Sequence, residues 1–151
     1  MRTLQTQLTL WTEGLLDRSA LVDWAAAQIA AQDEPAWELI ELVLEGPEAC
    51  MRKAEADFPI RPLELTYADH FALRALVLEL TDDAASLRFC GWAAQAALAE
   101  DLENPMVKLG YRLDHWLVDC ENAVGALQCL REQLPALLPE CRDRAARLGW
   151  S

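Results

Sequence analysis

Apolar residues recur at intervals of three and four along most of this chain, and the pattern is strongest between residues 66 and 80. In that stretch four large aliphatic residues repeat at helical spacing: Leu73, Leu76, Val77 and Leu80. A second apolar row covers another side of the same helix. A helix that is apolar around most of its circumference needs neighbours on more than one side. The pattern therefore predicts that residues 66–80 form the central helix of a helical domain.

Local signals mark where several helices begin and end. Thr66 at the N-cap position, with Asp69 three residues later, resembles a capping box with Asp in place of the usual Glu or Gln. Ser19 is expected to cap a second helix, and Asn104 stands before a proline that suits a first helical turn. Gly149 is a stop signal near the end of the chain.

Periodicity predicts helices over most of the chain and no β-strand. The expected helices cover residues 4–17, 19–32, 35–45, 47–58, 66–80, 84–102, 105–134 and 139–149. Pro135 and Pro139 are expected to break the chain between the last two. We therefore expect an all-α fold, a single domain over residues 1–151, built as a bundle or orthogonal array of about seven to eight helices.

The helix expected over residues 35–45 has an acidic side. Its inward side is predicted to consist of four apolar residues, Trp37, Ile40, Val43 and Leu44. Its outward side carries three glutamates at three- and four-residue spacing, Glu38, Glu41 and Glu45. No lysine or arginine on that helix can pair with them, so this is the densest uncompensated acidic row in the chain.

The charge balance narrows the possible partners. The chain of 151 residues has a formal net charge of −12, and residues 1–105 carry all of the excess, with 19 acidic and 7 basic groups. Nucleic acid and anionic membrane surfaces would be repelled by such a protein, whereas a basic partner would be attracted and steered to it. No apolar run reaches the roughly 20 residues that span a bilayer. The N-terminus lacks a signal-peptide pattern, so we expect a cytoplasmic protein.

The cysteines and histidines suggest little chemistry. Five scattered cysteines without a Cys-x-x-Cys pair indicate free, mostly buried thiols in a reducing compartment. His115 and Asp119 are four residues apart, a spacing that suits joint metal ligation, but no further ligand is fixed by spacing. Cys120, five residues after His115, is expected to diverge from it by more than 90° on a helix. The sequence therefore predicts no catalytic residue, no metal site and no cofactor, and a protein that is not an enzyme.

Two segments near the N-terminus carry a resemblance to a known group of proteins. LWTEGLLDRSALVDWAAAQIA followed by EPAWELIELVLEG resembles the start of small acidic helical proteins encoded beside bacterial toxins, the immunity proteins. The similarity covers about residues 1–46. Immunity proteins of this kind bind their toxin and block its active or substrate-binding surface. The resemblance thus implies a stoichiometric inhibitor without catalytic residues of its own.

These observations lead to a hypothesis with one alternative. We expect a non-enzymatic acidic protein that sequesters or inhibits a basic protein partner, such as a toxin. Its partner-binding surface is predicted to consist of five carboxylates: Asp33, Glu34, Glu38, Glu41 and Glu45. The alternative is a small-molecule or metal-binding helical protein with a pocket near His70 and His115. Trp150, beyond the last helix, either docks back on the protein or forms an exposed anchor for a partner.

Overall fold

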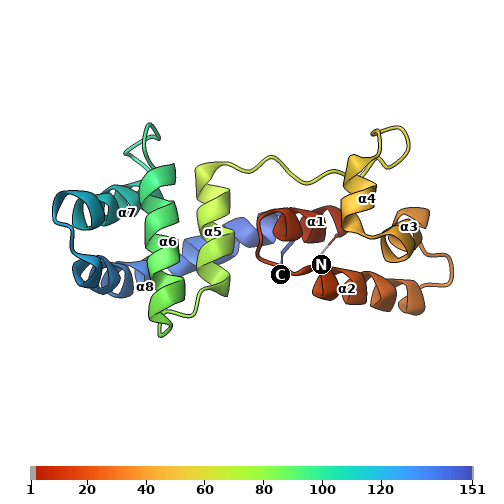
Figure 1. The fold of residues 1–151 in the computed structure, drawn as a ribbon, viewed down its shortest axis with the longest axis horizontal. Coiled ribbons are helices and arrows are strands. Elements are labelled where there is room, and N and C mark those ends of the chain that lie inside the picture. The colour runs from red at the N-terminus through yellow and green to blue at the C-terminus, as the bar shows by residue number, and fades with distance from the viewer. Residues whose placement is uncertain (1–2, 151) are drawn as a thin grey trace. The chain divides into compact units, whose positions relative to one another are not determined.

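The computed structural model describes residues 3–150, and this part of the chain is all-helical (Figure 1). It contains eight α-helices, one π-helical turn and no β-strand, which confirms the all-α prediction. The helices are α1 (Leu4–Thr12), α2 (Arg18–Ala31), α3 (Trp37–Glu45), α4 (Pro47–Arg52), α5 (Tyr67–Val77), α6 (Asp83–Ala96), α7 (Pro105–Asp114) and α8 (Ala123–Arg147), with the π-helical turn η1 (His115–Asp119) between α7 and α8. Within residues 3–150 no helix is long and apolar enough to cross a membrane.

The backbone contacts divide the chain into two compact units. Unit 1 holds α1 to α4 together with Gly149 and Trp150, and unit 2 is Leu65–Leu148 with α5 to α8. Trp150 was expected either to dock back on the protein or to be an exposed anchor for a partner. It is half-buried, which favours docking. The single-domain expectation for the whole chain stays a prediction.

Unit 1 is built from four short helices around a small core. Its hydrophobic core cluster consists of Leu8, Leu21, Ala25, Leu39, Leu42, Cys50 and Phe58. Asp17, and not Ser19, caps α2: its carboxylate accepts hydrogen bonds from the Ala20 amide at 2.8 Å and from the Ser19 hydroxyl at 3.0 Å. The helix expected over residues 47–58 ends at Arg52. A turn follows, in which the Phe58 amide donates to the Ala54 carbonyl at 3.0 Å, and an extended segment comes after the turn. That segment is held to α1 because the Leu63 amide donates to the Thr9 hydroxyl at 2.9 Å.

In unit 2, α5 packs mainly against α8, and it ends at Val77, before the predicted residue 80. Val77, expected in its apolar row, is exposed at 43%. The capping box at the start of α5 is complete, with the Asp69 amide donating to the Thr66 hydroxyl and the Thr66 amide donating to the Asp69 carboxylate. Six residues of α5 are buried, and five of them, all except Leu73, belong to the core cluster shared with α6, α7 and α8. Two of them, Tyr67 and Phe71, form a cluster of aromatic rings with Phe89 and Trp92 of α6.

The helix expected over residues 105–134 is two helices. After α7 the chain passes through η1, then takes a positive φ of 47° at Glu121, and α8 begins when the Asn122 side chain accepts the Gly125 amide at 2.9 Å. The return allows α7 and α8 to pack together. The six-membered ring of Trp116 lies so close to Gly125 that an added Cβ there would be 2.3 Å from it, so only glycine fits.

Pro135 and Pro139 do not break the chain, contrary to the sequence-based expectation. Both lie inside α8, which runs on as a single helix to Arg147. Each proline removes one backbone hydrogen bond. Both are exposed, so water can hydrate the carbonyl groups that lose their partners, while Leu134 and Cys141 on the buried side hold the helix in the core.

Candidate functional site

The apolar residues of α3 point in a direction that the sequence pattern did not predict. Leu39 and Leu42 are the residues of α3 that are buried in unit 1, with exposed fractions of 6% and 0%. Trp37, Ile40 and Leu44 were expected to face inward but are exposed, at 50%, 39% and 78%. The expectation failed because α3 carries apolar residues on both sides, so the helical period fits either orientation.

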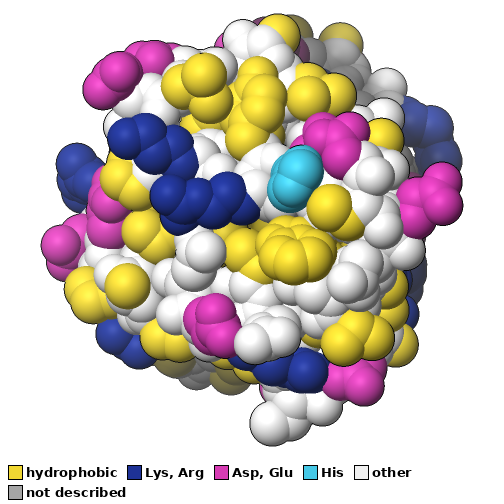
Figure 2. Space-filling view, turned by 90° about the vertical axis from the view of Figure 1, so that its left-hand side faces the viewer, with side chains coloured by type: hydrophobic (Ala, Val, Ile, Leu, Met, Phe, Trp, Pro, Cys, Tyr) yellow, Lys and Arg dark blue, Asp and Glu magenta, His cyan; other side chains and the backbone are white. Residues whose placement is uncertain are grey.

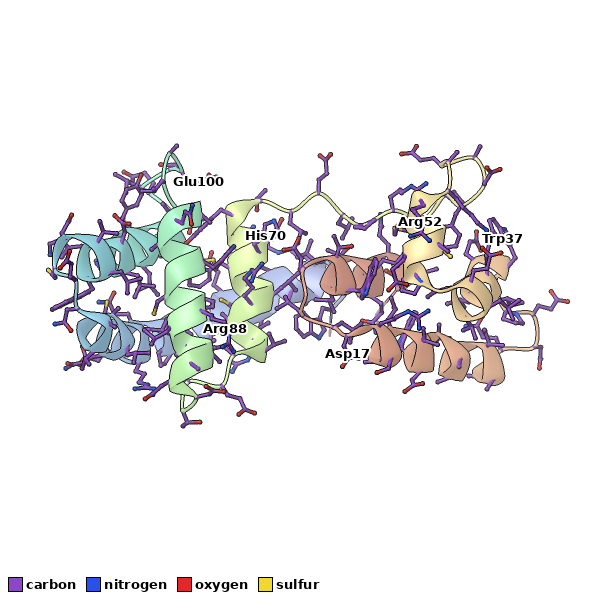
Figure 3. All side chains as sticks on the ribbon, in the orientation of Figure 1. Asp17, Trp37, Arg52, His70, Arg88 and Glu100 are labelled. Carbon is purple, nitrogen blue, oxygen red and sulfur yellow. The ribbon has the colours of Figure 1, made fainter. Side chains whose placement is uncertain are left out.

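These three residues form one exposed stripe, which we call the α3 stripe: Trp37, Ile40 and Leu44. Their spacing of three and four places them on one face of the helix, opposite the buried leucines. The Trp37 ring contacts Phe58 edge-on, with the ring centroids 6.1 Å apart, which orients the indole while half of it remains exposed. Figure 3 marks Trp37 on α3 in unit 1.

The acidic row on α3 is partly compensated, which corrects the sequence-based description. The Lys53 ammonium group, just beyond α4, forms ion pairs with Glu41 and with Glu45, the latter at 2.9 Å. These two hydrogen-bonded carboxylates raise the pKa of Lys53 above its usual value. Lys53 was missed because α4 brings it to α3 only in the folded chain.

The other three predicted carboxylates lie just before α3 and in its first turn. Asp33 and Glu34 are exposed in the segment between α2 and α3, and Glu38 lies in the first turn of α3. Within residues 3–150 none of them forms an ion pair. The α3 stripe therefore lies next to a helix edge whose glutamates are partly neutralised, and follows a loop with two exposed acidic groups.

The two histidines are in different environments within unit 2. His70 on α5, marked in Figure 3, lies beside Trp92, with a ring-centroid distance of 6.3 Å. Arg74, one turn further along α5, places its guanidinium carbon 4.5 Å from the centroid of the same Trp92 ring. His115 lies in η1 and lines a pocket that His70 does not line. The pocket expected near both histidines therefore involves His115 without His70.

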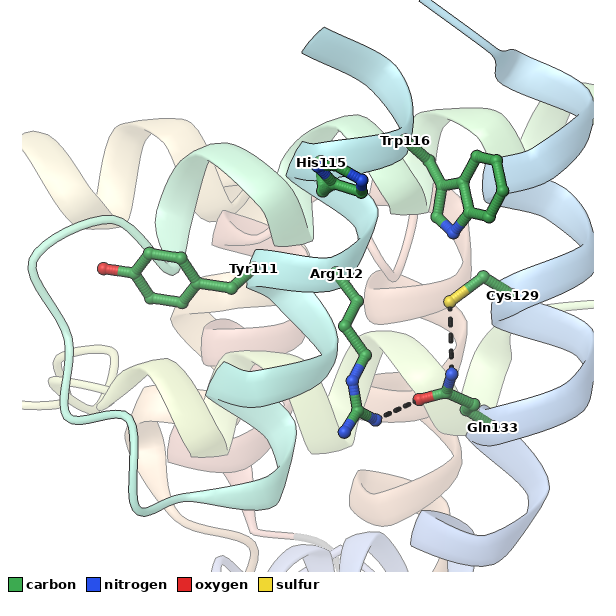
Figure 4. A pocket seen from close by; sticks show the side chains of 6 residues that line it. All are labelled: Tyr111, Arg112, His115, Trp116, Cys129 and Gln133. Atoms are coloured by element: carbon green, nitrogen blue, oxygen red, sulfur yellow. Dashed lines mark hydrogen bonds between the residues drawn. The ribbon is translucent and has the colours of Figure 1, made fainter. Parts of the chain in front are cut away.

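That pocket has a volume of about 310 Å³ (Figure 4). Its lining residues come from α7, η1 and α8: Tyr111, Arg112, His115, Trp116, Cys129 and Gln133. The Gln133 amide accepts a hydrogen bond from Arg112 and donates one to the Cys129 sulfur at 3.4 Å. Figure 2 looks onto the side where α7 and α8 lie in Figure 1, and on it a histidine lies among acidic, basic and hydrophobic side chains.

His115 contacts two side chains, Asp119 and Cys120. The sequence-based prediction had excluded the contact with Cys120. Its Nδ1 atom is 3.0 Å from Asp119 Oδ2, and its Nε2 atom is 3.5 Å from Cys120 Sγ. In an α-helix residues five apart are rotated by about 140° around the axis. Here the backbone is π-helical, with the Cys120 amide donating to the His115 carbonyl at 3.0 Å, and this brings the two side chains together.

The remaining cysteines have a different character. Cys50, Cys90, Cys129 and Cys141 are buried and Cys120 is exposed, all as free thiols. Burial raises the pKa values of the four buried thiols, to about 11 for Cys90 and Cys141. Within residues 3–150 no group of three or more His, Cys, Asp or Glu side chains is arranged to hold a metal ion.

Comparison with known proteins gave no further guide to function. No family model, no curated protein and no solved structure matches this chain significantly.

Proposed function

We propose that this protein is a non-enzymatic binding protein whose α3 surface receives a basic protein partner. The observation that carries the proposal is the α3 stripe, three large apolar side chains exposed on one helix face beside acidic groups. Contiguous exposed apolar residues rimmed by polar ones are typical of protein interaction sites. Tryptophan is also the residue type most enriched among those that dominate binding energy.

The charges around the stripe support a partner of basic character. Asp33, Glu34 and Glu38 form no ion pair with another residue of the described range 3–150, and the protein as a whole carries a formal net charge of −12. Complementary charge at the rim of an interface mainly raises the association rate, while burial of apolar anchors at its centre slows dissociation. We infer that the partner offers an apolar groove for Trp37 and Leu44 with lysine or arginine residues at its edge.

The finer form of the proposal is a stoichiometric inhibitor of the immunity type, acting in the cytoplasm without metal or cofactor. It rests on the resemblance of residues 1–46 and on the acidic character of α3. Such an inhibitor would cover the active or substrate-binding surface of a basic toxin.

Site-specific crosslinking tests the proposal. A photoreactive amino acid is placed at Leu44, or at Leu102 as a control, since both side chains are at least half exposed and belong to different units. After irradiation in cells that naturally produce the protein, crosslinked partners are identified by mass spectrometry. We expect a basic protein crosslinked from position 44 and not from position 102. Equal crosslinking from both positions, or an acidic partner at position 44, would contradict the proposal.

A second candidate function is small-molecule binding at the pocket beside His115. Its volume of about 310 Å³ is at the lower end of the range for ligand pockets, and it combines aromatic walls with the cationic Arg112. An anionic aromatic compound is the class of ligand that fits this lining. Screening such compounds by nuclear magnetic resonance, with Arg112→Gln as the control, separates this candidate from the first.

A further inference from the structure

The three side chains at η1 have the geometric relationship of a nucleophile, a base and an orienting carboxylate. Cys120 Sγ lies 3.5 Å from His115 Nε2, and the opposite ring nitrogen, Nδ1, lies 3.0 Å from Asp119 Oδ2. An activated nucleophile is recognised by a base within hydrogen-bond reach that is itself oriented by a third group. Single π-helical turns of this kind are also frequent at functional sites.

We propose that Cys120, His115 and Asp119 form a nucleophilic thiol site that accepts an acyl group from a thioester or activated ester. The proposal concerns one covalent acylation per chain and requires no turnover. It is independent of partner binding by α3, because the two sites belong to different units.

The chemistry needs no co-reactant besides the acyl donor. His115 Nε2 takes the proton from the Cys120 thiol as the sulfur attacks the carbonyl carbon and a C–S bond forms. The bond from the carbonyl carbon to the leaving oxygen or sulfur then breaks, and the leaving group takes the proton from Nε2. Asp119 touches neither the sulfur nor the donor: it is a positioning residue that keeps the proton of neutral His115 on Nδ1.

The surroundings favour Cys120 over every other cysteine. Cys120 is exposed and so can be reached by a donor, whereas the other four thiols are buried and have raised pKa values. Val118, within η1, and Val124, in the first turn of α8, are exposed at 62% and 74%. The ring of Trp116 against Gly125 and the Asn122 cap hold the turn in place.

The site is tested with p-nitrophenyl acetate as the acyl donor. The release of p-nitrophenolate gives the rate of acetylation, and mass spectrometry locates the acetyl group. We expect one acetyl group on Cys120 and none in Cys120→Ser. His115→Ala should slow acetylation at pH 7 by about 100-fold, the lower end of the contribution of a general base. Asp119→Asn should slow it by about tenfold or more, and Asp114→Asn, the same change in a neighbouring residue, should leave it unchanged.

The pH profile separates base catalysis from a structural effect. Asp119 and Cys120 contact His115, and the titratable and charged groups that line the pocket beside it are Tyr111 and Arg112 on α7 and Cys129 on α8. In the native protein the rate should depend less on pH than in His115→Ala, because Nε2 can take the thiol proton as the sulfur attacks. In His115→Ala the rate should rise steeply with pH, because the thiolate and not the thiol is the nucleophile. A rate in the native protein equal to that of N-acetylcysteine, or an unchanged rate in His115→Ala, would overturn the proposal.

Discussion

The hydroxyl group of Tyr67 occupies the space that a side chain at Gly110 would need. A Cβ atom at Gly110 would lie 2.6 Å from that oxygen, 2.5 Å from the Ala97 Cβ and 2.7 Å from the Ala93 carbonyl. The Tyr67 hydroxyl itself is 3.2 Å from the carbonyl oxygens of both Ala93 and Met106. Through this close approach α5, α6 and α7 pack together in unit 2, and the packing requires glycine at position 110.

Gly110→Ala should therefore destabilise the protein. Overpacking a close contact costs typically about 1–3 kcal/mol, and here two of the three neighbours are backbone or Cβ atoms that cannot rotate away. Gly91→Ala is the matched control: Gly91 lies within α6, and a Cβ there would meet nothing within 4 Å. It should stabilise by about 0.5–1 kcal/mol through helix propensity. Urea unfolding of both variants checks the prediction, and equal effects of the same sign would contradict it.

Tyr67 should also make the protein sensitive to alkaline pH. Burial raises the pKa of Tyr67 above its usual value, with the nearby Glu100 adding to the effect. A raised pKa in the folded state means that the stability is fully present below about pH 10, the ordinary value for tyrosine, and is lost as the pH rises above it. The free energy of unfolding of native protein and Tyr67→Phe should therefore converge above pH 10. A constant difference between pH 8 and pH 11 would show that Tyr67 ionises equally in both states.

Asp69 should make the free energy of unfolding depend on pH in the acid range, with the stability lost as the pH falls. Burial would raise the pKa of Asp69, but hydrogen bonds from the Thr66 amide, Arg144 and the Thr66 hydroxyl outweigh it, and the pKa is lowered. The stabilisation is thus present above about pH 4 and is lost as the pH falls through the lowered value.

Asp69→Asn checks this directly. At pH 7 it should cost about 1 kcal/mol, as expected for the loss of a capping interaction, and the difference from the native protein should shrink below pH 4. Asp143→Asn, at an exposed position on α8, makes the same change of charge and should alter stability by less than about 0.5 kcal/mol. If Asp143→Asn reproduces the acid dependence, the effect belongs to net charge and not to the cap.

Charge reversal at the predicted partner surface should slow association. Glu34→Lys with Glu38→Lys removes two of the carboxylates that carry no ion pair within residues 3–150. Electrostatic steering changes association rates by about tenfold or more at low salt, so the rate should fall by about that factor and its salt dependence should flatten. The control is Glu100→Lys with Glu103→Lys, the same change of net charge on exposed residues of unit 2. Surface plasmon resonance with the partner identified by crosslinking measures the association rates of both double variants. Equal slowing of the two would show that α3 is not part of the interface.

The sequence was informative where a structural feature depends on residues close together in the chain. The capping box at Thr66 and Asp69, the start of α7 after Asn104 and the positive φ of 88° at Gly149 all appear as expected. Each involves hydrogen bonds or backbone angles within four residues, so the local sequence contains all of the partners.

Features that depend on distant residues could not be read in the same way. The orientation of α3 was ambiguous because Leu39 and Leu42 compete with Trp37, Ile40 and Leu44 for the core, and only packing against α2 and α4 decides between them. The pairing of Lys53 with Glu41 and Glu45 likewise requires α4 to fold back on α3.

The sequence by itself determined that this chain is helical, acidic and capped at defined points, because helical period, charge and capping are properties of short segments. Only the tertiary structure decided which apolar face of α3 stays in water and that Cys120 meets His115. The first depends on burial shared among helices far apart in the chain. The second depends on a π-helical turn held by Trp116 against Gly125, a contact between two helices that no local pattern specifies.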